Sequence, residues 1–230
     1  MPQDSPPFSI ILPVHNEELA VEQVISGLIK QFEGCEIVAV DDGSEDNSYQ
    51  ELAKFDINIV RHEKKRGYGA ALKSGIKNST SDFIIIMDCD GTFAPQDIPN
   101  LLQSCDGHDM VVGARLLGNS GEKTIHKWIK GSVCLALSVI FRQRILDVNS
   151  GFRLMRKEVV CRYLSILPDR FSFTASITLA MLIDGHKIKY VPIVYSPRIG
   201  KSKVRKFKYA LNFIRNYWRV FYHLKLVKRS

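Results

Sequence analysis

The sequence lacks the features that would place it among disulfide-stabilised or membrane-spanning proteins. Its five cysteines are scattered, with no Cys-x-x-Cys pair. This spacing predicts buried free thiols in a reducing compartment. Uncharged runs such as Gly131–Phe141 are well short of the ~20 residues that cross a bilayer. The polar, proline-rich start, Met1–Pro7, does not resemble a signal peptide, so we expect a cytoplasmic protein or one that lies on a membrane without crossing it.

Acidic residues are absent from the last part of the sequence. No Asp or Glu follows Asp184, whereas Lys and Arg continue to the end, and the formal net charge is +8. A basic tail of this kind predicts an anionic partner, which could be a phosphate, a nucleic acid or an anionic membrane surface. The 230 residues, of which 45% are hydrophobic and 24% charged, are typical of a soluble globular protein with a buried core.

Short apolar segments alternate with segments of helical periodicity through the first half of the chain. We expect strands at Ser9–Val14, Glu36–Val40, Ile57–Arg61, Phe83–Met87 and Asp109–Ala114. Helices are expected between them, the first of them capped by Asn16. This alternation predicts an α/β fold with a mostly parallel sheet that is flanked by helices on both faces.

The order of elements changes after the fifth strand. We expect helices at Thr124–Arg144, Lys157–Ser165, Phe173–Asp184 and Val204–Val227, and a last strand at Lys187–Ile193. Residues 1–203 would form one domain, and residues 204–230 a basic, amphipathic C-terminal helix. The first and last of these four helices mix aromatic and aliphatic residues with Lys and Arg, which fits helices lying on anionic lipid. Core helices or an oligomer interface are the alternatives.

Two carboxylates one residue apart carry the clearest chemical signal. The apolar run Phe83–Met87 ends in Asp88 and Asp90, which would leave the sheet at its carboxyl end. Open α/β sheets place their ligands there, and a carboxylate pair suits a hard divalent cation that also binds substrate phosphates. An ordinary turn with solvated Asp residues is the alternative.

A basic, glycine-containing loop precedes one of the expected helices. Glu63–Ala71 includes Gly67 and Gly69 together with Lys64, Lys65 and Arg66. Such a loop at a helix N-terminus predicts an anion site. It does not meet the dinucleotide fingerprint, because the third glycine is missing and the loop follows a third strand rather than a first.

Five motifs in this order resemble family 2 glycosyltransferases of the GT-A fold. They lie in Ile10–Glu18, Val40–Asp46, Met87–Asp90, Asp147–Arg153 and Val191–Lys203. The last two make the chain similar to polyprenyl-phosphate glycosyltransferases of the dolichyl-phosphate mannose synthase type. The resemblance extends from about Phe8 to Lys203.

The resemblance implies a site for a nucleotide-sugar donor such as GDP-mannose or a UDP-hexose. The base and ribose would be held by Pro13, His15, Asn16, Glu17 and Asp42, with Lys65 or Arg66 assisting at the diphosphate. A tyrosine is usual where this sequence has His15. Asp88 and Asp90 would contact the ribose and, through Mg²⁺ or Mn²⁺, the diphosphate. The metal would neutralise charge on the departing nucleoside diphosphate.

The stretch Phe171–Ile177 contains no acid, although family 2 enzymes that act on sugar hydroxyls carry a general base there. A hydroxyl acceptor needs its proton removed, whereas a phosphate monoester is already largely ionised at neutral pH. The missing base therefore favours a phosphate acceptor, held by cations. The candidates are Arg115, Lys127, Arg153, Arg198, Lys201 and Lys203. We expect Asp90, Arg115, Arg153 and Arg198 to be the catalytic residues.

These expectations combine into an inverting transfer of a hexose to dolichyl or undecaprenyl phosphate on the cytoplasmic face of a membrane. A separate membrane-anchoring subunit is among the expected partners. A transferase with a soluble glycan or protein acceptor is the alternative within the fold, and a small-molecule-binding protein without activity is another. A nucleic-acid-binding protein is a remote alternative, because acids gathered at one sheet edge would repel a nucleic-acid backbone.

Overall fold

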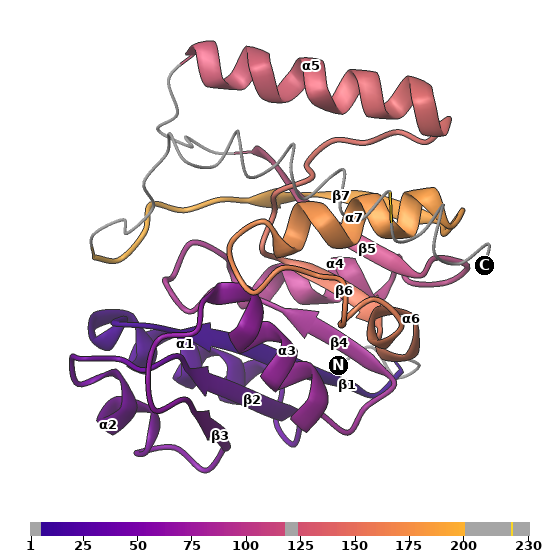
Figure 1. The fold of residues 1–230 in the computed structure, drawn as a ribbon. Helices are drawn as coiled ribbons and strands as arrows, with labels where there is room; N and C mark the ends of the chain where they lie inside the picture. Colours follow the sequence, from indigo (N-terminus) through magenta and orange to yellow (C-terminus); the bar gives the residue numbers. More distant parts are fainter. Residues whose placement is uncertain (1–5, 118–123, 201–221, 223–230) are drawn as a thin grey trace.

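The protein is built around one mixed sheet of seven strands in the order β3-β2-β1-β4-β6-β5-β7 (Figure 1). The computed structural model describes residues 6–117, 124–200 and 222. The strands are β1 (Phe8–Val14), β2 (Glu36–Asp41), β3 (Asn58–Arg61), β4 (Phe83–Ile86), β5 (Met110–Leu117), β6 (Arg153–Arg156) and β7 (Ile188–Val194). The predicted α/β class with a mostly parallel sheet is confirmed, because β3, β2, β1 and β4 are parallel neighbours and β5 pairs with β7 in parallel.

Strand β6 is the element that the sequence did not predict. It pairs antiparallel with both β4 and β5, so it sits between the two parallel parts of the sheet. Its sequence, Arg-Leu-Met-Arg, is only four residues long and begins and ends with arginine. Such a segment is too short to show the periodicity by which a strand is predicted.

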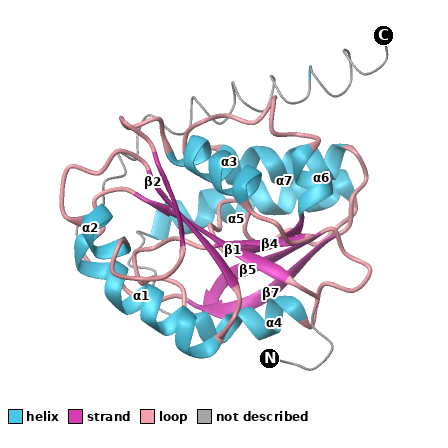
Figure 2. Cartoon of the chain, turned by 90° about the horizontal axis from the view of Figure 1, so that it is seen from below, coloured by secondary structure: helices cyan, strands magenta, loops and turns pink. Residues whose placement is uncertain are grey.

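Helices cover both faces of the sheet (Figure 2). They are α1 (Glu18–Gln31), α2 (Ser48–Leu52), α3 (Tyr68–Asn78), the 3₁₀ turn η1 (Pro95–Asp97), α4 (Ile98–Leu102), α5 (Thr124–Phe141), α6 (Lys157–Cys161) and α7 (Phe173–Ile183). Alternate residues of β4 enter different cores: Phe83 and Ile85 pack with α1 and α4, whereas Ile84 and Ile86 pack with α3, α6 and α7. This alternation is what a strand buried on both faces requires.

The N-cap of helix α1 lies one residue later than the predicted cap. Glu17 is the N-cap residue, whereas Asn16 has a positive φ of 54°. The Asn16 side chain accepts a hydrogen bond from the Glu45 amide (2.8 Å), and the Asn16 amide donates to Ser44 Oγ (3.0 Å). The prediction of Asn16 as a helix cap is therefore wrong: this residue joins the loops that follow β1 and β2.

The other helices end within a few residues of the predicted ends, and most of them are shorter than predicted. Helix α6 ends at Cys161 rather than Ser165, and α5 ends at Phe141 rather than Arg144. The predicted helix Val204–Val227 lies outside the described residues, apart from Tyr222. Among the helices that the structure describes, none has the length and apolar character needed to cross a bilayer.

The strand order brings three loops to one edge of the sheet. Strand β1 lies between β2 and β4, and all three run in the same direction. The residues that follow them, Pro13–Glu17, Asp41–Ser44 and Asp88–Asp90, therefore meet at the carboxyl edge. Ligand sites of open α/β sheets lie at such an edge.

Candidate active site

The Asp90 carboxylate is held in a fixed orientation just beyond β4. The side chain is 7% exposed, and its Oδ1 accepts hydrogen bonds from the Thr92 amide (3.0 Å) and the Thr92 hydroxyl (2.5 Å). Its other oxygen, Oδ2, lies 3.1 Å from Arg198 Nη1. A carboxylate that accepts this many bonds has little freedom to turn away from its position.

Arg198 reaches this carboxylate from the loop that follows β7. Its guanidinium also pairs with the Glu17 carboxylate after β1. The Ile199 amide donates to the Asp90 carbonyl (2.9 Å), and the Ser196 amide donates to the Thr92 carbonyl (3.0 Å). The loop thus lies directly against the Asp90 turn, and it brings one cation between two carboxylates from distant parts of the chain.

Asp88 is the second carboxylate of the pair and is confined on two sides. The Tyr68 hydroxyl donates to Asp88 Oδ1 at 2.8 Å. On another side lies Gly151, where an added Cβ would stand 2.6 Å from Asp88 Oδ2. Only a glycine fits there without moving the carboxylate.

The ionisation of Asp88 depends on its charged neighbours. Burial and the nearby Asp90 carboxylate raise the pKa of Asp88 to about 7, although the Tyr68 hydrogen bond and the charges of Arg115 and Arg198 act in the opposite direction. Two carboxylates in one site disfavour each other's ionisation. A bound cation would relieve this repulsion.

The donor set at this edge fits Mg²⁺ or Mn²⁺. Among the described residues, no group of three or more His, Cys, Asp or Glu side chains gathers into a complete metal cage. Mg²⁺ usually binds through one or two carboxylates together with substrate phosphates and water. Asp88 and Asp90 would supply those carboxylates.

Asp42 organises the basic loop of residues 62–67. Its Oδ1 accepts from the Arg66 amide (2.8 Å) and lies 2.7 Å from His62 Nδ1, and its Oδ2 accepts from the Gly67 amide (2.8 Å). The other nitrogen of the His62 ring lies 2.9 Å from Ser74 Oγ on α3. Asp42 is only 3% exposed, so its immediate role is to position this loop. A nucleotide contact by Asp42 remains a prediction.

The N-terminus of α3 is occupied by the protein itself. The Ala70 amide donates to the Asp169 carbonyl (3.0 Å), while the Gly67 amide is used by Asp42. A Cβ added to Gly69 would stand 2.2 Å from the Pro168 carbonyl oxygen. The glycines therefore let the backbone of residues 168–169 approach closely, and two of the amides at this helix end are used by the protein. The anion site expected there stays a prediction.

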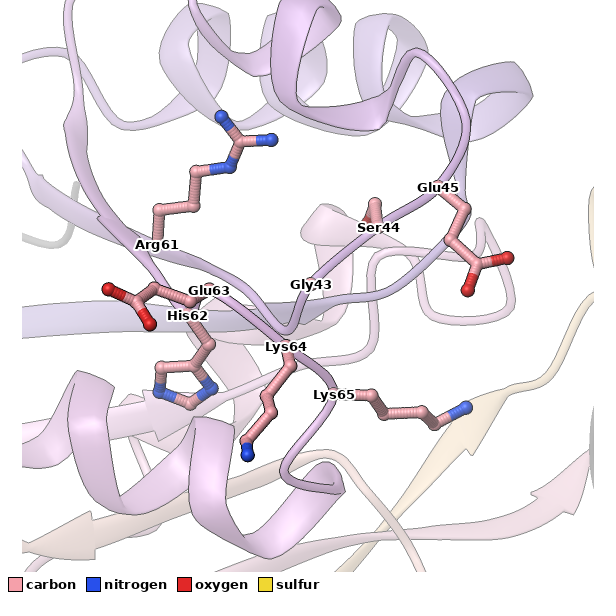
Figure 3. Close-up of a pocket in the computed structure, with 8 residues that line it drawn as sticks. All are labelled: Gly43, Ser44, Glu45, Arg61, His62, Glu63, Lys64 and Lys65. Carbon is pink, nitrogen blue, oxygen red and sulfur yellow. The ribbon is translucent and has the colours of Figure 1, made fainter.

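A hollow lies beside this loop, at the ends of β2 and β3. It is lined by Gly43, Ser44, Glu45, Arg61, His62, Glu63, Lys64 and Lys65. Figure 3 shows Arg61 on one side of Gly43 and the side chains of Glu45 and Lys65 on the other. The Arg61 guanidinium stacks 4.0 Å above the Tyr49 ring, and its Nε lies 3.3 Å from Asp41 Oδ2. Lys65, which was expected to assist with the donor, thus lies at this hollow.

The other predicted donor residues lie near the same edge. Pro13 and His15 are partly exposed at the end of β1, and Glu17 is paired with Arg198. Arg66 contributes its backbone amide to Asp42, while its side chain is exposed. Glu17 is linked to Asp90 through Arg198, and the donor roles of these residues stay predictions.

Arg115 lies in the second half of β5, and its side chain is held by Asp147. Arg115 Nε and Nη2 lie 2.6 and 2.9 Å from the two oxygens of that carboxylate. Burial raises the pKa of Asp147, but the hydrogen bonds and charge of Arg115 outweigh it and hold the pKa below its usual value. The guanidinium carbon also lies 5.6 Å from the centre of the Tyr195 ring. The side chain of Lys127 and both Lys201 and Lys203 lie outside the described part.

Arg153 does not take the position that the sequence suggested. Its side chain is 0% exposed, and its guanidinium donates to the carbonyls of Ser150 and Val148 (both 2.7 Å) and to the Thr178 hydroxyl (2.6 Å). The predicted substrate contact by Arg153 is wrong. Burial lowers the pKa of this arginine, and its bonds join the turn before β6 to α7.

We expect Arg153→Ala to lower the free energy of unfolding by about 2–3 kcal/mol, because it leaves buried carbonyl groups unpaired and opens a cavity. Urea denaturation followed by circular dichroism measures this change. Arg162→Ala is the control, since Arg162 is paired only with the exposed Glu158 one helical turn away. Equal unfolding midpoints for wild type and Arg153→Ala would contradict the structural role.

Comparison with known proteins identifies the family. The model of glycosyl transferase family 2 matches residues 9–164. The chain belongs to glycosyl transferase family 2. It is 31% identical to a dolichol-phosphate mannosyltransferase from Pyrococcus furiosus over 92% of this chain and 63% of that protein, so it spans less than two thirds of this relative's length. It is also 25% identical to a dolichyl-phosphate hexose transferase from Haloferax volcanii over 87% of each chain.

Solved structures support the GT-A fold of this family 2 glycosyltransferase. The structure of glucosyl-3-phosphoglycerate synthase from Mycobacterium tuberculosis with Mn²⁺, UDP-glucose and phosphoglyceric acid has a TM-score of 0.74 and 19% identity, covering 94% of this chain and 80% of that one. A structure of the same synthase with Mg²⁺ and UDP has a TM-score of 0.72 at 19% identity, covering 94% and 78%. At this identity the likeness establishes the fold alone.

Several residues of the transferase's site were not found from the sequence. Tyr68 contacts Asp88 and Thr92 fixes Asp90. Asp147 was part of a predicted motif, but its pairing with Arg115 was not predicted. The contact of Thr92 could have been predicted from the sequence, since a hydroxyl two residues after an Asp is a common hydrogen-bond partner of that Asp in a turn. That of Tyr68 could not, because nothing in the spacing of Gly67 and Gly69 indicates where the side chain between them points.

Proposed function

We propose that this glycosyltransferase moves a hexose, with inversion, from a nucleoside diphosphate sugar to a polyprenyl phosphate. The observation that carries the proposal is the set of charges around Asp88: the Asp90 carboxylate, Arg115 and Arg198. Two carboxylates suit a metal–diphosphate, and two arginines suit a phosphate acceptor. The names of the relatives, dolichol-phosphate mannosyltransferase and dolichyl-phosphate hexose transferase, support the same acceptor class.

The region where a general base would be expected supports a phosphate acceptor. Phe171 is 42% exposed and stacks on Tyr68, while Phe173, Ala175 and Ile177 are buried in the core. No described side chain in this stretch can accept a proton from a sugar hydroxyl. A phosphate monoester needs no such base, because its second ionisation has a pKa of about 6.

The proposed reaction forms one bond and breaks one. An acceptor phosphate oxygen attacks the anomeric carbon, and the bond from that carbon to the donor diphosphate breaks on the opposite face. Arg198 and Arg115 would orient the acceptor phosphate through their guanidinium groups. Asp88 and Asp90 would hold Mg²⁺ or Mn²⁺, which neutralises charge on the leaving diphosphate. No proton transfer and no covalent enzyme intermediate are required.

Helix α5 supports the proposed work at a membrane surface. Its outer side exposes Leu135 (67%), Val139 (71%) and Ile140 (66%) to solvent. Apolar side chains at this spacing line one face of a helix, and such a face can bury itself at the headgroup boundary. We include peripheral membrane binding at the cytoplasmic face in the proposal for this reason.

The test is an incubation of the protein with a short polyprenyl phosphate in anionic vesicles, Mn²⁺ and a panel of labelled nucleotide sugars. Label from one donor is expected to enter the organic phase and to stay aqueous with EDTA. The same reaction identifies the sugar and the base, and pelleting of the protein with the vesicles tests surface binding. Donor binding without organic-phase label from any donor would overturn the lipid acceptor in favour of a soluble one.

A further inference from the structure

The Tyr68 side chain connects α3 to the carboxylate pair. Tyr68 is the first residue of α3, and its hydroxyl donates to Asp88 Oδ1 at 2.8 Å. A tyrosine hydroxyl is an uncharged donor at neutral pH. One oxygen of Asp88 therefore accepts a hydrogen bond from an uncharged group.

The Tyr68 ring is held by an aromatic neighbour from a distant segment. Phe171 stacks on it with ring centres 5.3 Å apart and an interplanar angle of 12°. Stacked aromatic pairs of this kind add stability beyond that of the area they bury. Phe171 stands just before α7, in the stretch that lacks a general base.

The backbone around this aromatic pair is fixed as well. The Asp169 carbonyl accepts from the Ala70 amide (3.0 Å), and Lys73 Nζ bonds both the Asp169 carboxylate (2.7 Å) and the Leu167 carbonyl (2.5 Å). A Cβ added to Gly67 would stand 2.5 Å from the Asp169 carbonyl oxygen. Residues 167–171 and the start of α3 therefore form one rigid unit that sets the position of the Tyr68 ring.

Asp88 also has a close neighbour in the turn before β6. Gly151 leaves no room for a side chain, since an added Cβ would stand 2.6 and 2.9 Å from the two Asp88 oxygens. Asp88 is thus limited by contact with the Gly151 backbone and directed by the Tyr68 hydroxyl. Confinement of this kind leaves the other carboxylate oxygen in a defined place.

We propose that Tyr68 is a positioning residue for the metal ligand Asp88, and that Phe171 holds Tyr68 in place. The inference rests on the proposed function, because it takes Asp88 to be a metal ligand. Hydrogen-bond partners of metal ligands orient them, and their loss typically costs about 10- to 100-fold in metal affinity or activity. The segment that carries a base in related enzymes would here act through an aromatic pair on the metal site.

The test measures Mn²⁺ binding rather than turnover. Free Mn²⁺ is titrated with the purified full chain in the presence of a nucleoside diphosphate, and the unbound ion is read by electron paramagnetic resonance. Tyr68→Phe removes one oxygen and keeps the stack, and it is expected to weaken Mn²⁺ binding by about 10-fold. Phe171→Ala is expected to weaken it several-fold, whereas Phe171→Tyr, which keeps a stacking ring, is expected to restore wild-type affinity.

Tyr163→Phe is the matched control. The Tyr163 hydroxyl donates to the Asp184 carboxylate at 2.8 Å, the same distance and the same pair of residue types, but far along the chain from the site. Its removal is expected to leave Mn²⁺ affinity unchanged. A lower affinity of Tyr163→Phe, equal to that of Tyr68→Phe, would mean that general loosening explains both and would overturn the inference.

The outcomes separate this inference from the proposed function. If the wild-type protein binds Mn²⁺ and Tyr68→Phe binds it with the same affinity, the role of Tyr68 is overturned and the metal site stays in place. A wild-type protein that binds no Mn²⁺ with any nucleoside diphosphate would overturn the metal assignment and, with it, this inference. Weaker binding in both Tyr68→Phe and Phe171→Ala, with Tyr163→Phe unchanged, supports both.

Discussion

Asp90→Ala is expected to lower hexose transfer by about 10³- to 10⁴-fold while the protein stays folded. The metal supplies several kcal/mol of charge stabilisation to the leaving group, and each ~1.4 kcal/mol corresponds to tenfold in rate. Asp90 is one of the two carboxylates that would hold it, and Thr92 fixes its orientation. The measurement is the initial rate of label entering the organic phase at saturating Mn²⁺.

Two further variants make this result specific to the Asp90 charge. Asp90→Asn keeps an oxygen that can accept from Thr92 but removes the negative charge, and the same large loss is expected. Asp106→Ala changes an exposed acid between α4 and β5, and full activity is expected. If Asp90→Ala kept wild-type activity with divalent metal, the metal assignment would be wrong.

Arg198→Ala is expected to lower transfer by about 10²- to 10³-fold. The variant leaves the carboxylates of Asp90 and Glu17 without the guanidinium that pairs with both. Removing one partner of a partly buried charge pair costs ~2–5 kcal/mol, and the acceptor phosphate would lose a bidentate contact in addition. Initial rates at varied acceptor and donor concentrations are the measurement.

The concentration dependence separates the two roles of Arg198. We expect the KM for the polyprenyl phosphate to rise more than that for the nucleotide sugar, and Arg198→Lys to recover part of the loss, because a lysine supplies charge without the planar fork. Arg162→Ala, which removes an exposed helix pair with Glu158, is expected to behave as wild type. Unchanged kinetics for Arg198→Ala would exclude it from acceptor binding.

The carboxylate edge could be predicted from the sequence because its signals are local. Each strand there is an apolar run that ends in a polar motif, and parallel strands place their carboxyl ends together. Asp88 and Asp90 were found in this way, whereas Asp42 and Glu17 were assigned to the donor site by the family resemblance. Periodicity and chain order are sufficient for such a pattern, since no contact between distant side chains has to be known.

The direction of individual side chains could not be predicted from the same signals. Arg153 follows a glycine-containing turn and carries a charge, yet it is as fully buried as its neighbour Phe152. Its partners, among them Thr178 on α7, are set by tertiary packing. The contact of Tyr68 with Phe171 likewise joins residues about a hundred positions apart, and no local pattern records it.

Strand β6 has a consequence for how the enzyme's two substrates are accommodated. This strand is antiparallel to both of its neighbours, and it separates the four strands β3-β2-β1-β4 from the pair β5-β7. The carboxylates that we propose as metal ligands, Asp88 and Asp90, come from the first side of β6, whereas Arg115 and Arg198 come from the second. The family model ends at residue 164, before Phe171, Tyr195 and Arg198. In the proposed function, the donor and acceptor residues therefore come from opposite sides of β6, and Arg198 joins the two sides through its pairs with Asp90 and Glu17.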